Sequence, residues 1–100
     1  MATRRLRRSS GSVFQDLGFS KEEAENLRIR SDLMVRLAQL IEKRGLTQAE
    51  AAQVLGVSQP RVSDLIRGKI DLFSIDTLVL MLTKAGLEVR FTTRARRRVA

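Results

Sequence analysis

The stretch that decides the fold runs from residue 46 to residue 69 and reads LTQAEAAQVLGVSQPRVSDLIRGK. Thr47 and Glu50 have the spacing of a capping box, which predicts a helix from residue 48 to residue 55. Gly56 can end that helix because glycine most easily takes the left-handed backbone conformation. Ser58 can then cap a second helix, whose first turn tolerates Pro60. The stretch therefore predicts two short helices joined by a tight turn.

The apolar residues of this stretch fit a helix-turn-helix unit over residues 48–67. Ala52 falls where the two helices would cross, and a larger side chain would push them apart. Four apolar residues supply the wedge that sets the angle between the helices: Leu55, Val57, Val62 and Leu65. In this geometry the second helix protrudes enough to enter the major groove of DNA, which is about 12 Å wide. The alternative interpretation is a purely structural helical hairpin.

The chain before this unit also has a helical pattern. Ser20 and Glu23 form another capping box, which begins a helix at residue 21. We expect this helix to break or bend near Ser31-Asp32, a second plausible cap, and to stop at Gly45. Its apolar stripe after the break consists of Leu33, Leu37, Leu40 and Ile41. The preceding apolar residues are expected to pack on the body, with Gly18 as a turn; they are Val13, Phe14, Leu17 and Phe19.

A last helix is predicted from the cap at Ser74 to Gly86, with an apolar stripe of Ile75, Leu78, Val79 and Leu82. After Gly86 the apolar residues alternate with polar ones, which predicts a half-buried strand over residues 87–92. The chain is therefore expected to be all-α, with five helices and one C-terminal β-strand. We assign residues 13–86 to a single domain.

A single strand in a helical chain leaves its backbone groups unpaired, which invites a second copy of the chain. An antiparallel pair centred on Val89 would set Glu88 opposite the partner's Arg90. The predicted homodimer interface consists of Leu80, Met81, Leu87, Glu88, Val89, Arg90 and Phe91. The alternative is that the strand folds back on its own helices.

The charge of the chain is concentrated at its ends. The formal net charge is +8 and the isoelectric point is about 11.4, which favours an anionic partner. Residues 1–12 and residues 87–100 carry +4 each, while residues 13–86 hold ten cations and ten acids. We expect residues 1–12 and 93–100 to be flexible basic arms that attract phosphates. Alternatives are merely solvated termini or, for residues 1–11, a transit peptide.

The composition excludes several classes of function. Histidine, cysteine, tryptophan and tyrosine are all absent, which removes zinc sites, thiol or histidine catalysis and disulfides. We therefore expect no enzyme activity, no metal and no cofactor. The longest apolar run is five residues, Leu78 to Leu82, far short of a membrane span. The expected location is the cytoplasm, with association to the nucleoid when the protein is bound to DNA.

The stretch 46–69 resembles the Xre/Cro family of phage-repressor-type regulators. The lead-in GFSKEEAE at residues 18–25 and the segment SQPRVS at residues 58–63 resemble the HigA-type antitoxin branch of that family. This resemblance spans about residues 13–91. It implies a lambda-repressor-like DNA-binding domain and a transcriptional repressor, the antitoxin of a type II toxin-antitoxin pair that represses its own operon.

The resemblance also implies roles for individual residues. The residues expected to contact bases are Gln59, Pro60, Arg61, Ser63 and Asp64. Gln59 would read a base edge, most favourably adenine, whereas Asp64 could instead pair with Arg61 or Arg67. The residues expected to contact the DNA backbone are Gln48, Ser58, Arg67, Lys69, Lys43 and Arg44. The alternative for each backbone candidate is an ordinary solvated surface position.

The expected partners are double-stranded DNA with an inverted repeat, a second copy of the chain and a basic RNase-type toxin. Residues 16–25 are acidic and are the predicted contact for such a toxin. Two other interpretations remain open at this point: a stand-alone phage-like repressor and a basic RNA-associated protein. The second is disfavoured because only four phenylalanines could stack on bases.

Overall fold

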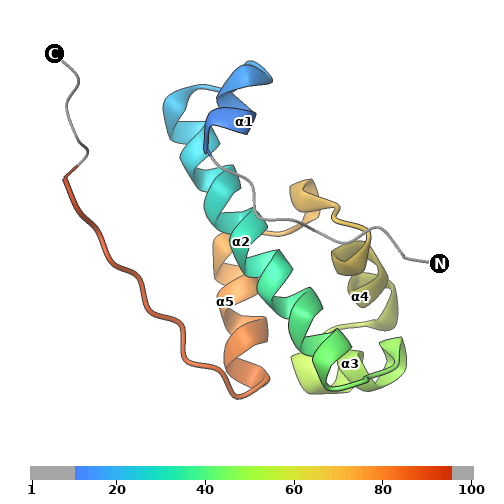
Figure 1. Ribbon diagram of the computed structural model, residues 1–100. Helices are drawn as coiled ribbons and strands as arrows, with labels where there is room; N and C mark the ends of the chain where they lie inside the picture. Colours follow the sequence, from blue (N-terminus) through green and yellow to red (C-terminus); the bar gives the residue numbers. More distant parts are fainter. Residues whose placement is uncertain (1–10, 96–100) are drawn as a thin grey trace, which may run out of the picture.

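The computed structural model describes the backbone of residues 11–95 and the side chains of residues 13–95. The predicted basic arms lie largely outside the described residues. Within them the chain forms α1 (Gly11–Asp16), α2 (Lys21–Lys43), α3 (Gln48–Leu55), α4 (Gln59–Ile66), the 3-10 helix η1 (Ile70–Leu72) and α5 (Ile75–Lys84), as Figure 1 shows. Five α-helices and no strand are therefore found between residues 11 and 95. None of these helices is long and apolar enough to span a bilayer.

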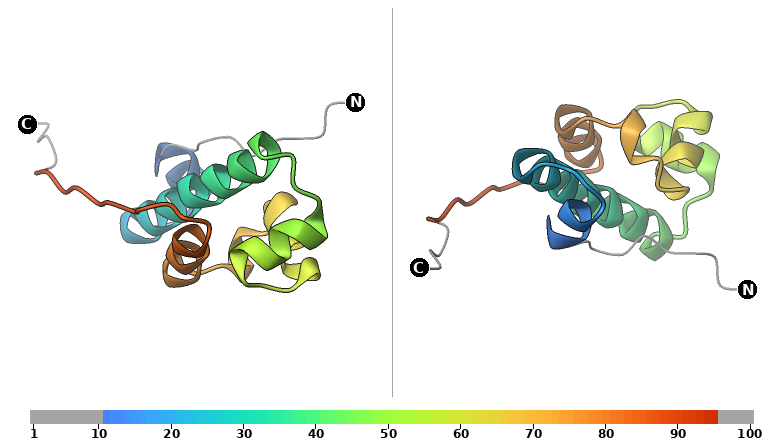
Figure 2. Two further views of the ribbon diagram at one scale, coloured as in Figure 1. Left: turned by 90° about the horizontal axis from the view of Figure 1, so that it is seen from below. Right: turned by 90° about the horizontal axis from the view of Figure 1, so that it is seen from above.

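The long helix α2 organises the domain. Both α5 and the α3–α4 pair lie on one side of α2, as Figure 2 shows. The short helix α1 packs on the opposite side of α2. The core between the helices contains Met34, Leu37, Leu40, Ile41, Ala51, Leu55, Val62, Leu65, Phe73, Leu78, Met81, Leu82 and Ala85. This burial of apolar surface is the main stabilising contribution to the fold.

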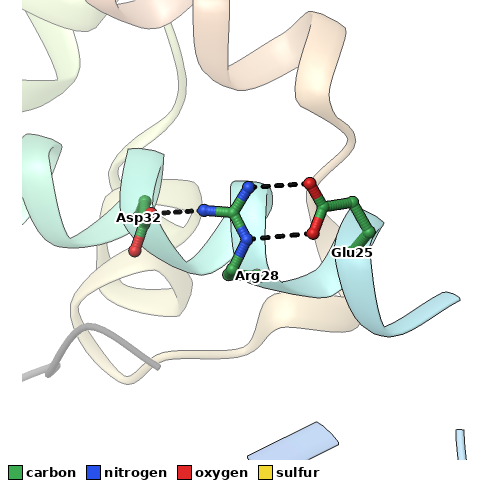
Figure 3. Close-up of polar contacts among 3 residues, drawn as sticks. All are labelled: Glu25, Arg28 and Asp32. Atoms are coloured by element: carbon green, nitrogen blue, oxygen red, sulfur yellow. Dashed lines mark hydrogen bonds and ion pairs between the residues drawn. The ribbon is translucent and has the colours of Figure 1, made fainter. Parts of the chain in front are cut away.

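The predicted break in α2 is wrong, because the helix is continuous from residue 21 to residue 43. Asp32 does not cap a new helix. Its Oδ2 accepts a hydrogen bond of 3.2 Å from Arg28, one turn earlier, and Arg28 also forms a forked pair with Glu25 at 3.1 and 2.9 Å (Figure 3). Such pairs three and four residues apart favour a continuous helix. The capping box at the start of α2 is confirmed, with both Ser20–Glu23 hydrogen bonds at 3.1 Å.

The segment before α2 is also more regular than predicted. Residues 11–16 form α1, and Gly18 takes a φ of +100° in the turn that follows. The rings of Phe14 and Phe19 meet edge to face with their centres 6.5 Å apart, across this turn. This end of the molecule nevertheless leaves apolar side chains exposed, because Val13, Leu17 and Phe19 are 47%, 70% and 43% exposed.

The helix-turn-helix unit has the predicted turn and wedge. Both bonds of the Thr47–Glu50 capping box are present, and Gly56 ends α3 with a φ of +70°. Leu55, Val62 and Leu65 are at most 1% exposed, and Val57 packs against them. Two alanines of α3 face the core to different extents. Ala51 is fully buried, whereas Ala52 is partly buried at the edge of the core.

The C-terminal segment forms no strand within the described residues, because one chain offers it no partner. Leu87 and Val89 pack against the core of their own chain, and Phe91 is 58% exposed. From there the chain runs away from the helices as an extended segment (Figure 1). The prediction that Met81 belongs to the dimer interface is wrong. Its side chain is 1% exposed and belongs to the core of the single chain, so it is not available to a partner.

Candidate nucleic-acid interface

The first turn of α4 is accessible on its outer side. Ser58 caps α4, and its Oγ accepts a hydrogen bond of 3.3 Å from the backbone N–H of Arg61. The next two residues, Gln59 and Pro60, are exposed. The opposite face of α4 is anchored by Val62 and Leu65, which are fully buried. A rigid core therefore presents the start of α4 to the solvent at the edge of the molecule (Figure 1).

Arg61 lies differently from its neighbours in the same turn. Its guanidinium stacks over the ring of Phe73, with 4.4 Å between the guanidinium carbon and the ring centre. Phe73 is 1% exposed, so Arg61 covers an otherwise buried ring. A cation over an aromatic face contributes about 0.5–2 kcal/mol. No signal in the sequence predicted this contact, because the two residues are twelve positions apart.

The end of α4 is held by an ion pair that the sequence interpretation missed. Asp64 Oδ1 lies 3.7 Å from Lys69 Nζ, and the Asp64 carbonyl accepts a hydrogen bond of 3.1 Å from the Lys69 N–H. The suggestion that Asp64 pairs with Arg61 or Arg67 is therefore wrong. Ser63 and Asp64 are partly buried, unlike Gln59, and Asp64 points its charge at the loop after α4.

The predicted backbone contacts fall into two groups. Gln48 is exposed at the first residue of α3, and Ser58 and Arg67 are exposed at the two ends of α4. Lys43 is exposed at the end of α2. Arg44 differs from these residues because its side chain contacts another helix end: its Nη2 donates a 3.1 Å hydrogen bond to the carbonyl of Ala85, just after α5. Arg44 thus joins α2 to α5.

The charge of the unit itself is small. Residues 46–69 hold three cations and two acids, so most of the net charge of +8 lies in other parts of the sequence. Among residues 13–95, no group of three or more acidic, histidine or cysteine side chains is arranged to hold a metal ion. The site offers an amide, a hydroxyl, a proline ring and scattered cations, which suits recognition of a polyanion by shape and hydrogen bonding.

Comparisons with known proteins agree with this geometry. The profile of a protein family described as a helix-turn-helix domain matches residues 13–93. A solved structure named for the XRE family of transcriptional regulators aligns with a TM-score of 0.71 and 32% identity, covering 78% of this chain and 91% of that chain. The chain belongs to the XRE family of helix-turn-helix proteins. No curated protein matches it.

The matched region of this XRE-family protein is much longer than the 48–67 motif. It includes α1, the first half of α2 and the segment after α5. These parts therefore belong to the family's domain and are not additions to it. Membership of the family indicates a DNA-binding transcriptional regulator, with α4 as the second helix of its helix-turn-helix unit.

Proposed function

We propose that this XRE-family protein is a sequence-specific transcriptional repressor that reads DNA with the first turn of α4. The observation that carries the proposal is the exposure of Gln59 and Pro60 on a helix whose other face, Val62 and Leu65, is fully buried. The Gln59 amide has the donor and acceptor that pair with adenine in the major groove, and the Pro60 ring can contact a thymine methyl group.

Residues around this turn would set the position of the protein on the duplex. Gln48 and Ser58 are exposed at the starts of α3 and α4, and Arg67 is exposed at the end of α4. Contacts from such positions to phosphates orient a protein without reading sequence. Lys69 would contribute less, since it already lies 3.7 Å from the Asp64 carboxylate.

The direct test is a footprint on the DNA upstream of the protein's own gene. A repressor of its own operon is expected to protect an inverted repeat there. The control is a scrambled duplex of equal length, since equal length carries equal phosphate charge. Equal affinity for the upstream and scrambled duplexes at physiological salt would contradict sequence-specific recognition.

A homodimer completes the proposal. Leu80 on α5 and Phe91 in the C-terminal segment are 55% and 58% exposed, which leaves apolar surface for a second copy. Residues 87–92 would pair antiparallel with their copy about Val89. Within one chain, Arg90 Nη2 lies 3.1 Å from Glu88 Oε1, so pairing would exchange this contact for one with the partner's Arg90.

The dimer would present two copies of α4 about 34 Å apart, which suits an inverted repeat. Measurement of the solution mass of the full chain, of a chain lacking residues 87–100 and of Leu80→Asp tests this assembly. We expect a dimer for the full chain and monomers for both variants. A truncated chain that stays dimeric would remove the segment from the interface.

We further propose that the protein is an antitoxin that binds a basic RNase-type toxin through residues 16–25. Supporting this, Leu17 and Phe19 are 70% and 43% exposed beside Asp16, Glu22 and Glu23. An apolar patch with an acidic border suits a basic protein partner.

Co-expression with the product of the neighbouring gene is the experiment that tests the antitoxin proposal. The native chain should co-purify with that product. Leu17→Asp should abolish the complex, and Leu72→Asp, a change at another exposed leucine, should retain it. If the neighbouring gene encodes no small basic protein, or if Leu17→Asp binds normally, the stand-alone repressor becomes the better interpretation.

A further inference from the structure

An open pocket of about 430 Å³ lies between the first turn of α4 and elements outside the helix-turn-helix unit. Its walls come from the first half of α2, the first turn of α4, η1 and the start of α5. The side chains used below are Asn26, Arg30, Arg61, Asp71, Phe73 and Thr77. The DNA-reading role proposed for Gln59 makes no use of this pocket.

Arg61 enters the pocket already ordered. Its guanidinium rests on the buried Phe73 ring, and none of the guanidinium nitrogens makes a hydrogen bond or ion pair to another residue within 13–95. The five N–H donors of a guanidinium are forked to match phosphate oxygens. Because stacking has already restricted the side chain, little rotamer entropy remains to be lost when an anion binds.

Arg30 supplies a second, more firmly held guanidinium. Its Nη1 donates to the carbonyls of Ile70 and Phe73 at 3.2 and 3.3 Å, and its Nε donates to Asn26 Oδ1 at 2.7 Å. The Nη2 group has no acceptor among the described residues. Since the Asn26 oxygen accepts from Arg30, its amide NH2 is left as a further donor.

The other polar groups of the lining are two hydroxyls and one carboxylate. At the start of α5 the hydroxyls of Ser74 and Thr77 lie 2.9 Å apart, and Ser74 Oγ accepts from the Thr77 N–H at 3.1 Å. Asp71 is the single acid of the lining, and it is exposed. Two guanidinium groups against one carboxylate give the pocket a net positive charge. Its volume exceeds that of a phosphate ion and leaves room for an attached sugar.

We infer that this pocket binds a phosphoryl group between the free edge of Arg30 and the guanidinium of Arg61 that Phe73 holds in place. The group is either a phosphodiester of the DNA backbone or a free phosphorylated compound; only the first source rests on the proposed repressor function. Arg61 then contacts phosphate and does not read bases. Recognition would extend from α4 to the first half of α2, which the helix-turn-helix motif does not contain.

The binding of inorganic phosphate to the full-length chain tests the site without DNA. Amide resonances of residues 74–77 are followed by NMR while sodium phosphate replaces sodium chloride at constant ionic strength. We expect a saturable shift. Arg61→Met keeps an apolar stem over Phe73 and should weaken phosphate binding by about ten-fold to a hundred-fold, the effect of losing a hydrogen-bonded charge.

Three further variants separate the site from general charge effects. Arg36→Met removes an exposed arginine of α2 outside the pocket and should leave the titration unchanged. Asp71→Asn removes the acid of the lining and should tighten phosphate binding. Arg61→Lys keeps the charge without the fork and should bind more weakly than the native chain. Absence of a saturable shift, or equal loss in Arg36→Met and Arg61→Met, would overturn the inference.

A salt titration of duplex binding then identifies the source of the phosphoryl group. If the pocket holds a backbone phosphodiester, Arg61→Met should lower the slope of log K against log salt by about one unit and weaken binding to all duplexes alike. If the slope and affinity do not change while inorganic phosphate binding is lost, the pocket takes a free phosphorylated compound. If Arg61→Met loses operator specificity with no change of slope, Arg61 reads bases, which would contradict its role at a backbone phosphate. If the native chain shows no preference for an operator but still binds inorganic phosphate, the proposed function fails and the phosphate site stands.

Discussion

The helices α4 and α5 are built by the same local rules and yet face different surroundings. Each begins at a serine whose Oγ accepts from the N–H three residues later, Arg61 in α4 and Thr77 in α5. Each buries apolar residues in the same core, Val62 and Leu65 in α4 and Leu78, Met81 and Leu82 in α5. Their outer faces differ: α4 exposes Gln59 and Pro60, whereas α5 exposes Leu80.

This contrast shows that the inner face of a helix determines the fold and the outer face determines its partner. A polar amide on a rigid helix gains little from contact with an apolar surface but can form two hydrogen bonds with a base. Covering an exposed leucine with a protein surface lowers the free energy of the system. Exchanging outer residues should therefore change partners, while changing inner residues should unfold both helices alike.

The largest expected effect is on the inner faces. Leu65→Ala in α4 and Leu78→Ala in α5 each remove a side chain that is 0% exposed, and each should lower the free energy of unfolding by about 2–5 kcal/mol. Urea denaturation measures this loss. The comparison would break if one of the two variants cost less than about 1 kcal/mol, since that helix would then not depend on the shared core.

On the outer faces, the effects should separate by partner. Gln59→Ala should weaken binding to the cognate duplex by about 1–3 kcal/mol, relax base preference and leave stability unchanged. Leu80→Asp should bind a half-site duplex with native affinity, but it should no longer bind the full inverted repeat more tightly than a half-site. Quantitative gel shifts on half-site and full-site duplexes distinguish these results. If Gln59→Ala retains its base preference, another residue reads the DNA.

The two serine caps, Ser58 and Ser74, should contribute similarly to the free energy of unfolding. Ser58→Ala and Ser74→Ala each leave a first-turn N–H without its acceptor and should cost about 1 kcal/mol of stability. Thermal unfolding detects a change of this size. Glycine at either position should cost only a few tenths of a kcal/mol, which serves as the control. A difference of more than about 1 kcal/mol between the two alanine variants would show that the caps are not equivalent.

The smallest effect concerns pH and a third cap, at the start of α2. Hydrogen bonds from the backbone and then the side chain of Ser20 lower the pKa of Glu23 below its ordinary 4.5. The contribution of this bond is therefore present above pH 4.5 and is lost as the pH falls through the lower, folded value. The Ser20 amide resonance should shift in that range for the native chain and stay constant in Glu23→Gln. No such shift is expected at Arg61 or Thr77, which occupy the corresponding position in α4 and α5 and carry no acid.

Local patterns predicted the caps, the turn and the apolar wedge because each depends on residues a few positions apart. The Thr47–Glu50 box, Gly56 and the buried Leu55, Val62 and Leu65 were all readable from residues 46–69. The same reasoning failed at Ser31-Asp32. These two residues have the sequence pattern of a helix cap, yet the helix continues through them. Arg28 bonds both Glu25 and Asp32, which favours the continuous helix.

Other misses came from contacts between distant parts of the chain. The sequence analysis assigned Met81 to a partner, yet the core of one chain encloses it. Arg44 bonds the carbonyl of Ala85, 41 residues away, a contact that the sequence analysis did not predict. The pair of Asp64 and Lys69 is a local contact that was also missed; the turn after α4 brings the two side chains together.

By itself, the sequence determined the caps at which α2, α3, α4 and α5 begin and the turn at Gly56, because capping hydrogen bonds and periodicity act over three or four residues. Only the tertiary structure decided how the outer side chains are used. The stacking of Arg61 on Phe73, the two carbonyls held by Arg30 and the pocket between them join segments up to 43 residues apart. Such contacts form when burial of the shared core brings the helices together, and no local pattern records them.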